Sequence, residues 1–257
     1  MHSLKNLLVC ITGASSGIGA ACATEFARHG SSLILLGRRK ERLVRLASQL
    51  QSEFETKTKV VALDVRNAKE VEHTFVGLAP PWNEIDILVN NAGLSRGLAP
   101  LHKGSLQDWE EMIDTNIKGL LYVSRAVLPG MVERNRGHII NIGSIAGHQT
   151  YPGGNVYAAS KFAIVGLTRG IKMDLLGTRV RVSNVEPGLV KTEFSEVRFR
   201  GDTERAERVY QGFTPLQPED VAEVVVFCAS RPPHVNILEV SVLPNDQASV
   251  NLVNKTA

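Results

Sequence analysis

The sequence has few cysteines and no metal-binding pattern. Its three cysteines, Cys10, Cys22 and Cys228, are odd in number, far apart and set in apolar runs. No CxxC pair and no Cys/His cluster occurs, so the sequence indicates neither a disulfide framework nor a zinc site, and we expect no metal. Buried reduced thiols are typical of a reducing compartment, which favours the cytoplasm.

Long hydrophobic runs and long basic runs are also missing. The apolar run near the amino terminus, Leu7–Ile11, is too short for a signal peptide or a membrane span, so we expect no membrane association. The net charge is +3, from 29 Lys and Arg against 26 Asp and Glu, and the basic clusters GRRKERLVRL and VRFRGD are short. This balance excludes an extended nucleic-acid-binding surface.

What the sequence does have is an alternation of short apolar runs with stretches of helical length. The apolar runs predict strands at Leu7–Thr12, Leu33–Gly37, Lys59–Asp64, Ile85–Asn90, Gly137–Gly143, Val180–Glu186 and Leu238–Leu243. Helices are predicted at Gly17–Gly30, Lys40–Gln51, Leu106–Asn135, Asn155–Gly177 and Pro218–Ala229.

Strands that are apolar on both faces and alternate with helices favour a parallel sheet covered on both sides. We therefore predict an α/β fold, a Rossmann-type doubly wound parallel sheet of about seven strands with helices on both faces. No linker or repeat divides the 257 residues, so we predict one domain spanning 1–257. The charged stretch 190–212 follows a strand end and is a candidate lid over the site.

The first strand leads into a glycine-rich turn and a helix. Gly13, Gly17 and Gly19 are spaced GxxxGxG, with the small residues Ser15 and Ser16 between them. Glycines let backbone amides approach a pyrophosphate at the start of a helix, so the turn predicts a dinucleotide site. The alternative is a tight strand-to-helix turn with no ligand.

The end of the second strand indicates which dinucleotide binds. An NAD-binding chain usually carries Asp or Glu about 20 residues after the glycine motif. Here Arg38 and Arg39 occupy that place, and guanidinium groups pair well with a 2′-phosphate. We predict NADP(H), with Arg38 the first choice and Arg39 the second; the alternative is a solvated arginine pair.

Two further strand ends belong to the same predicted cleft. Asp64-Val65 ends the third strand, where a carboxylate can accept from the adenine amino group. Asn91, Ala92 and Gly93 follow the fourth strand, and their small side chains can lie against the ribose. Simple turn chemistry explains both segments equally well.

A serine, a tyrosine and a lysine are predicted to meet at the other half of the cleft. Ser144 ends the fifth strand, and Tyr157 and Lys161 are four residues apart on a helix that we expect Asn155 to cap. A phenol with a pKa near ~10 is a poor base at neutral pH, but a neighbouring ammonium group lowers that value. Reaching ~7 takes about 3 units, roughly 4 kcal/mol, which a partly dry site holding a cationic nicotinamide can supply. The alternative is an ordinary helix-surface pair.

Together these motifs resemble the short-chain dehydrogenase/reductase family. The matching segments are TGxxxGxG at Thr12–Gly19, NNAG at Asn90–Gly93, Ser144, and Tyr157 with Lys161. The resemblance implies that Tyr157 is the general acid/base, that Ser144 orients the carbonyl, and that Lys161 lowers the tyrosine pKa and holds the ribose. It also implies a role for Asn116, in MIDTNIKG, in positioning a proton-relay water, and it implies a homotetramer.

The resemblance also brings the segment EPGLVKTEF to the nicotinamide. Thr192 is the expected contact to the nicotinamide amide, with Pro187, Gly188 and Val190 beside it. The complete set of predicted cofactor-binding residues is Gly13, Ser15, Ser16, Gly17, Ile18, Gly19, Arg38, Arg39, Asp64, Val65, Asn91, Ala92, Gly93, Tyr157, Lys161, Pro187, Gly188, Val190 and Thr192.

A narrower resemblance, in GRRKERL, GGNVYAASK and EPGLVKTEFSEVRFRGD, is to the NADP-dependent 3-hydroxy acid dehydrogenases. It implies oxidation of a small-molecule 3-hydroxy acid, serine-like or 3-hydroxypropionate-like, or the reverse reduction. A carboxylate substrate needs a cation, and Arg96, Arg198 and Arg200 are the candidates. Two alternatives stay open: a family reductase for another small carbonyl, such as a sulfonate aldehyde or a 3-oxoacyl group, and a non-catalytic dinucleotide sensor.

Overall fold

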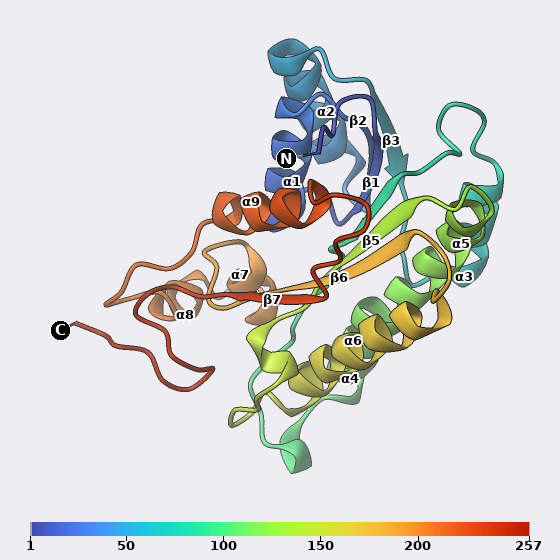
Figure 1. The fold of residues 1–257 in the computed structure, drawn as a ribbon. Helices are drawn as coiled ribbons and strands as arrows, with labels where there is room; N and C mark the ends of the chain where they lie inside the picture. Colours follow the sequence, from blue (N-terminus) through green and yellow to red (C-terminus); the bar gives the residue numbers. More distant parts are fainter. Residues whose placement is uncertain (1, 257) are drawn as a thin grey trace.

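Seven parallel strands form one sheet at the centre of the molecule (Figure 1). The structure is a computed structural model and describes residues 2–256. Across the sheet the order is β3-β2-β1-β4-β5-β6-β7, and every neighbouring pair is parallel. The strands are β1 Leu8–Thr12, β2 Ser32–Gly37, β3 Thr58–Ala62, β4 Ile87–Asn90, β5 Gly137–Ile142, β6 Val180–Pro187 and β7 Glu239–Val242. The predicted strands are confirmed, with ends that move by one or two residues.

Helices cover both faces of the sheet, as the doubly wound prediction requires (Figure 1). One buried apolar cluster joins the sheet to α1 Gly17–Arg28, α2 Lys40–Phe54 and α9 Pro218–Ala229. A second joins the opposite face to α3 Ala68–Val76, α5 Leu120–Glu133 and α6 Asn155–Asp174. The remaining helical elements are η1 Leu101–Lys103, α4 Leu106–Ile113, η2 Asp114–Gly119, η3 Ile145–Gly147, α7 Phe194–Arg198 and α8 Thr203–Arg208. In residues 2–256 no helix is both long and apolar enough to cross a membrane.

The predicted long helix Leu106–Asn135 is interrupted by a wider turn. Between α4 and α5 the backbone of η2 is a π-helix, a feature that adds a residue to a helical turn and is frequent at functional sites. Buried Gly119 explains the close packing there, since a Cβ on it would come 2.7 Å from Cγ2 of Val65. The interruption leaves Asn116 buried and turned inward.

The predicted cap of α6 is wrong. Helix α6 begins at Asn155, its N-cap is Gly154, and no side chain caps it. The Asn155 amide instead donates from Nδ2 to the backbone oxygen of Ala99 at 3.3 Å. The side chain therefore ties the helix start to a neighbouring loop.

The topology places a crevice between β1 and β4. These two strands are neighbours in the sheet, and the chain leaves them toward opposite sides, to β2 and to β5. In open parallel sheets, ligands bind at the carboxyl ends of strands beside such a reversal. The glycine turn after β1 and the Asn91–Gly93 segment after β4 both lie at this point.

Candidate active site

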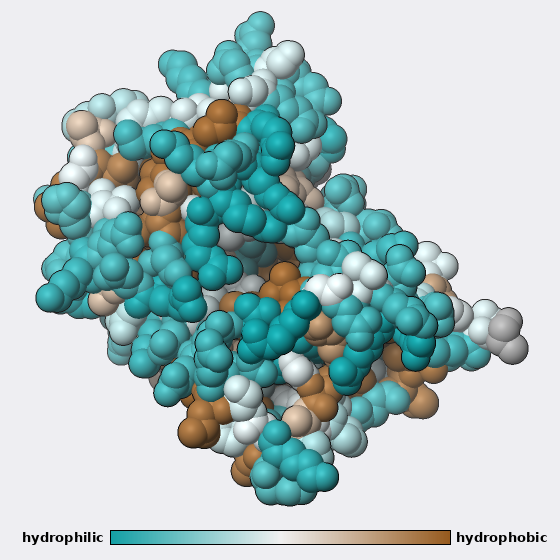
Figure 2. Space-filling view, turned by 180° about the vertical axis from the view of Figure 1, so that it is seen from behind, coloured by the Kyte–Doolittle hydropathy of each residue, from teal (hydrophilic) through white to brown (hydrophobic). Residues whose placement is uncertain are grey.

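A cleft of about 600 Å³ lies at the carboxyl edge of the sheet. It runs from the glycine turn and the end of β2 to Ser144, Tyr157 and Lys161, and most residues of the segment 187–198 line it as well. The face seen in Figure 2 is hollowed near its middle, with hydrophobic residues inside the hollow and hydrophilic residues around it. The two halves predicted from the sequence therefore lie in one cleft.

The glycine turn is a cradle that side chains would fill. Gly13 and Gly17 have φ of +66° and +53°, in the left-handed region that favours glycine. A Cβ on Gly19 would lie 2.5 Å from the Gly13 oxygen and 2.5 Å from Nδ2 of Asn91. Asn91 holds the turn in place by donating from that atom to the backbone oxygens of Thr12, at 3.0 Å, and Gly13, at 3.2 Å. This backbone can accept a pyrophosphate at the start of α1.

Arg39 reaches back from the end of β2 to the glycine turn. Its Nε donates to Oγ of Ser15 at 3.1 Å, and its Nη2 donates to Oγ of Ser16 at 2.6 Å. Arg38 also lines the cleft, but its side chain is exposed. Of the two arginines predicted for the 2′-phosphate, Arg39 is the one in contact with the turn.

Asp64 and Val65 line the cleft beyond β3, as predicted. Asp64 accepts from Nη2 of Arg66 at 2.6 Å and from Nε of Arg66 at 3.0 Å. Burial alone would raise the pKa of Asp64, but the hydrogen bonds from Arg66 hold it below its ordinary value. The carboxylate is therefore charged at neutral pH.

Ser144, Tyr157 and Lys161 meet at the other end of the cleft. Oγ of Ser144 accepts from the amide of Ala146 at 3.1 Å, which fixes the hydroxyl at the start of η3. Tyr157 and Lys161 are 9% and 6% exposed, and Nζ of Lys161 lies 5.8 Å from the centre of the Tyr157 ring. The same Nζ donates to the backbone oxygen of Ile142 at 2.9 Å.

Burial controls the protonation of this pair. Burial raises the pKa of Tyr157 to about 12 and Tyr151 adds to the rise, whereas Arg198 and a hydrogen bond with Ser144 oppose it. Burial also lowers the pKa of Lys161 to about 8. The structure thus differs from the expectation that Lys161 lowers the tyrosine pKa, because loss of water around the phenolate outweighs its charged neighbours.

Asn116 is buried behind the reactive residues and does not line the cleft. Its Nδ2 donates to the Leu94 oxygen at 2.9 Å and to Oγ of Ser160 at 3.0 Å, and its Oδ1 accepts from the Leu94 amide at 2.8 Å. Ser160 in turn donates to the backbone oxygen of Tyr157 at 2.7 Å. The Asn116 amide therefore ties the loop after β4 to the helix that carries Tyr157.

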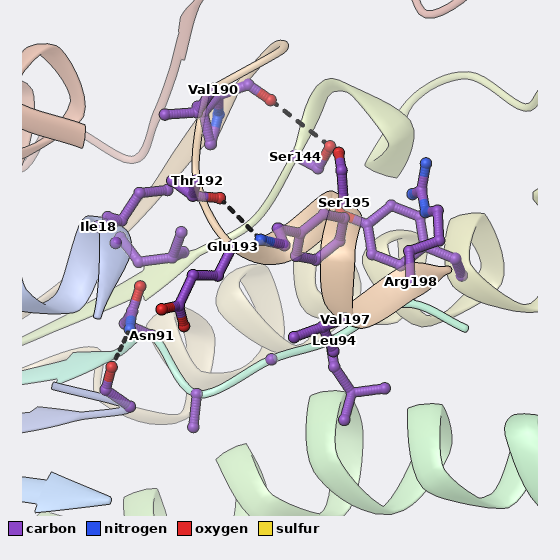
Figure 3. Close-up of a pocket in the computed structure, with 18 of the residues that line it drawn as sticks. Ile18, Asn91, Leu94, Ser144, Val190, Thr192, Glu193, Ser195, Val197 and Arg198 are labelled. Atoms are coloured by element: carbon purple, nitrogen blue, oxygen red, sulfur yellow. Dashed lines mark hydrogen bonds between the residues drawn. The ribbon is translucent and has the colours of Figure 1, made fainter. Parts of the chain in front are cut away.

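The segment after β6 closes the cleft over the glycine turn. Thr192 lies against Gly17, where an added Cβ would be 3.2 Å from Cγ2 of Thr192. Pro187, Gly188 and Val190 also line the cleft, as does Ile18 from α1. Figure 3 shows Val190 and Thr192 on one stretch of chain, with Ile18 next to Thr192.

The three arginines that are candidates for binding the substrate acid differ in their acidic partners. Arg96 donates from Nε to Glu111 at 2.6 Å, and Arg200 pairs with Asp108, so both are engaged by acids of α4. Arg198 lines the cleft, and no acidic residue among residues 2–256 forms a salt bridge with it.

The surroundings of Arg198 are aromatic. Its Cζ lies 5.2 Å, 5.3 Å and 5.9 Å from the ring centres of Phe194, Tyr157 and Tyr151, and its Nη2 donates to the Tyr151 hydroxyl at 3.0 Å. Within the described part of the chain, its Nε is buried without a hydrogen-bond partner. A guanidinium left in this state beside Tyr157 can bind an acidic group of a ligand.

Some cleft residues were not predicted individually. Tyr151 lies in HQTYPGG, next to the predicted site, whereas Val250, Val253 and Lys255 line the cleft from the end of the chain, where no local motif marks them. The structure also gathers His148, Glu186 and Glu239, with ligand atoms within 4.8 Å. Arg169 already pairs with Glu239, and Glu186 accepts from Asn184 and Ser241, so these carboxylates have protein partners.

Known proteins match the chain over most of its length. Residues 7–202 match the family model for short chain dehydrogenase. The chain is 51% identical over 247 residues to the NADP-dependent 3-hydroxy acid dehydrogenase of Salmonella typhi, covering 96% of this chain and 98% of that one. It is 47% identical over 242 residues to sulfoacetaldehyde reductase 2 of Chromohalobacter salexigens, covering 94% and 95%.

Solved structures agree with the fold. The closed form of a serine dehydrogenase complexed with NADP+ aligns with a TM-score of 0.90 at 48% identity, over 98% of this chain and 100% of that one. The serine dehydrogenase of Escherichia coli aligns with a TM-score of 0.81 at 44% identity, over 94% and 100%.

Proposed function

The chain belongs to the short chain dehydrogenase family, and from this premise we propose that it is an NADP-dependent oxidoreductase acting on a small 3-hydroxy acid or its oxo form. One observation carries the proposal. One end of the cleft has the glycine turn and arginines, and the other end has Ser144, Tyr157, Lys161 and Arg198. Arg198 has no acidic partner among the described residues. The names of the relatives, which include NADP-dependent 3-hydroxy acid and serine dehydrogenases, support the same substrate class.

Arg198 accounts for the acidic part of the substrate. A carboxylate bound by its guanidinium replaces the missing partner of the buried Nε. Because the same guanidinium lies beside the Tyr157 ring, a short 3-hydroxy acid held there presents its hydroxyl to the phenol and to Ser144. A short 3-hydroxy acid would therefore bind with both of its polar groups at this end of the cleft.

The glycine turn and the β2 end would hold the cofactor. Backbone amides around Gly13, Ser15, Ser16, Gly17, Ile18 and Gly19 would bind the pyrophosphate, and Arg38 and Arg39 the 2′-phosphate. Asp64, Val65, Asn91, Ala92 and Gly93 would line the adenosine and ribose, and Pro187, Gly188, Val190 and Thr192 the nicotinamide. When bound, NADP+ supplies the acceptor for the hydride that leaves the hydroxyl-bearing carbon.

The chain's own residues would move the proton. In oxidation Tyr157 takes the hydroxyl proton on Oη, and in reduction it returns one, while the Ser144 hydroxyl donates to the substrate oxygen. With a pKa near 12 in this structure, the phenol needs added positive charge to become a base at neutral pH. The positively charged nicotinamide ring of bound NADP+ would add such charge, and Asn116 holds the helix that carries both Tyr157 and Lys161.

The test is a panel of hydroxy acids with each nicotinamide nucleotide, followed by absorbance at 340 nm. We expect turnover of serine-like or 3-hydroxypropionate-like acids with NADP+, and much weaker turnover with NAD+. Matched alcohols without the acid group are the control, because they cannot use Arg198. Equal efficiency with both nucleotides, or equal turnover of the neutral alcohols, would contradict the proposal.

A sulfonate aldehyde is the second candidate substrate. Arg198 recognises an acidic group by charge and hydrogen bonding, and a sulfonate presents both. The 47% identity to a sulfoacetaldehyde reductase supports including this aldehyde in the panel. Reduction of sulfoacetaldehyde with a higher kcat/KM than any oxo acid would make it the preferred substrate.

We also propose a homotetramer formed from chains that are each one domain spanning 1–257. Ile113, Leu121 and Phe162, on the helical layer of α4, α5 and α6, are 38% to 44% exposed, and exposed apolar side chains gathered on one layer favour subunit contacts. All seven strands share one sheet, which supports a single domain. The test is light scattering after size-exclusion chromatography, where a mass other than four chains would contradict the tetramer.

A cytoplasmic location is the matching proposal for the compartment. The three cysteines are free and buried, as expected for a protein kept in a reducing environment. The check is fractionation of the source cells with detection of the native protein. Recovery outside the cytoplasmic fraction would contradict it.

A further inference from the structure

Glu193 joins the segment after β6 to the end of β2. It is the N-cap residue of α7, and its Oε2 accepts from Nη1 of Arg39 at 2.8 Å. Its Oε1 accepts from Nη1 of Arg42 at 2.5 Å. The two arginines hold the pKa of Glu193 below its ordinary value, although burial opposes this. The carboxylate is therefore a charged partner of both.

These contacts continue to the glycine turn. Arg39 donates from Nε and Nη2 to the hydroxyls of Ser15 and Ser16 while its Nη1 holds Glu193. A continuous line of hydrogen bonds thus runs from the start of α1, through Arg39, to α7. The residues it spans are those proposed to hold the pyrophosphate and the 2′-phosphate.

The same short helix reaches both ends of the cleft. In Figure 3, Glu193 extends toward Ile18 and Asn91, whereas Arg198 lies on the other side of Ser195. Arg198 is the last residue of α7. Holding Glu193 at the cofactor end therefore also sets the position of Arg198 beside Tyr157.

The charges allow Glu193 to stay in place when a phosphate binds. Arg38, Arg39 and Arg42 carry three positive charges at this end, and Glu193 removes one of them. A phosphate monoester carries close to two negative charges at neutral pH, which the remaining two balance. The side chains of Glu193, Arg39 and Arg42 are 38% to 41% exposed, and ion pairs so exposed are weak enough to open and close.

We propose that Glu193 is a positioning residue that ties α7 to Arg39 and Arg42 across the cofactor cleft, and that this tie opens each time the cofactor leaves. The inference rests on the proposed NADP-dependent function. It assigns Glu193 two effects: slow release of NADP(H), and placement of Arg198 for the acidic substrate.

The experiment measures the rate constant of NADPH release by stopped-flow fluorescence, with excess NADP+ displacing the nucleotide. Glu193→Gln keeps the size of the side chain and removes its charge, and Arg42→Gln removes the second arm of the tie. Glu196→Gln is the matched control, because Glu196 is an exposed acid on the same helix. The double variant Glu193→Gln/Arg42→Gln tests whether both residues act through one contact.

We expect Glu193→Gln to release NADPH about threefold faster or more, the size expected for loss of an exposed ion pair. Arg42→Gln follows in the same direction, the double variant is no faster than the faster single one, and Glu196→Gln matches the parent. The KM for the hydroxy acid rises in Glu193→Gln more than kcat falls, because Arg198 is displaced.

Unchanged release in Glu193→Gln would overturn the tie. Slower release and tighter NADPH binding would also overturn it, since Glu193 would then be a competitor of the 2′-phosphate. These results are distinguishable from failure of the proposed function, in which the parent protein itself does not bind NADPH. Thermal unfolding of each variant confirms that the compared proteins are folded.

Discussion

The guanidinium carbon of Arg198 lies 5.3 Å from the centre of the Tyr157 ring, so the cleft places a cation beside the phenol. Both Arg198 and Lys161 lie near this ring, yet they contribute differently. Arg198 helps to lower the pKa of Tyr157, whereas Lys161 is hydrogen-bonded to the backbone of Ile142. Arg198 is thus linked to the reactive residue as well as to the proposed acid group of the substrate.

The first prediction concerns Arg198 itself. In Arg198→Ala we expect kcat/KM for the hydroxy acid to fall about 10- to 100-fold, mainly through KM, because one charge-assisted contact is lost. Steady-state kinetics over a range of substrate concentrations measures the effect. Arg200→Ala is the control, since Arg200 pairs with Asp108 instead of facing the cleft. An unchanged KM in Arg198→Ala would remove the assigned role.

The second prediction separates proton transfer from cofactor binding. In Tyr157→Phe we expect kcat to fall by about 10³-fold or more, because the general acid/base is lost. The affinity for NADPH should stay near that of the parent, since the phenol hydroxyl is remote from the glycine turn that would bind the pyrophosphate. Titration of nucleotide fluorescence measures this affinity. Normal turnover by the variant would show that another residue carries the proton.

Local patterns in the sequence were enough to predict the fold and the ends of the cleft. The glycine spacing, the small residues after β4 and the Tyr157–Lys161 spacing each lie within one turn or helix. Parallel strands bring their carboxyl ends together, so these separate motifs converge once the topology is known. Asn116 came from family resemblance, because nothing in its own surroundings in the sequence marks it.

Contacts between distant segments could not be predicted from the sequence. Arg198 stands out from Arg96 and Arg200 because Glu111 and Asp108 of α4 engage the other two arginines. That choice depends on how α4 packs, which no local pattern encodes. The high pKa of Tyr157 likewise follows from burial, which the spacing of two residues does not reveal.

The third prediction concerns nucleotide choice. In Arg39→Ala we expect the ratio of kcat/KM for NADPH to that for NADH to fall about tenfold or more, because a guanidinium partner of the 2′-phosphate is lost. Arg38→Ala should shift the ratio in the same direction. Arg45→Ala, an exposed position on α2, is the control and should leave the ratio unchanged. If neither Arg38→Ala nor Arg39→Ala changes the ratio, these two arginines do not bind the 2′-phosphate.

The last prediction uses the low pKa of Lys161. Burial lowers it from 10.5 to about 8, so the folded protein is less stable at neutral pH while this buried side chain is protonated. A shift of this size corresponds to roughly 3 kcal/mol of lost stability below pH 8. Between about pH 8 and 10.5 the unfolded chain still binds the proton that the folded chain has released, so the stability of the parent rises with pH.

Lys161→Met removes the titrating group. We expect the cofactor-free variant to be more stable than the parent at pH 7, and this advantage to shrink between pH 8 and 10.5 as the parent gains stability. Urea unfolding at pH 7 and pH 9.5 measures the two differences, and Lys172→Met, which removes another lysine from the same helix, is the matched control. If the free energy of unfolding differs between Lys161→Met and the parent by the same amount across this range, burial does not lower the pKa of Lys161. A smaller difference at the higher pH, together with loss of turnover, would show that the fold sacrifices stability to keep the ammonium where the reaction uses it.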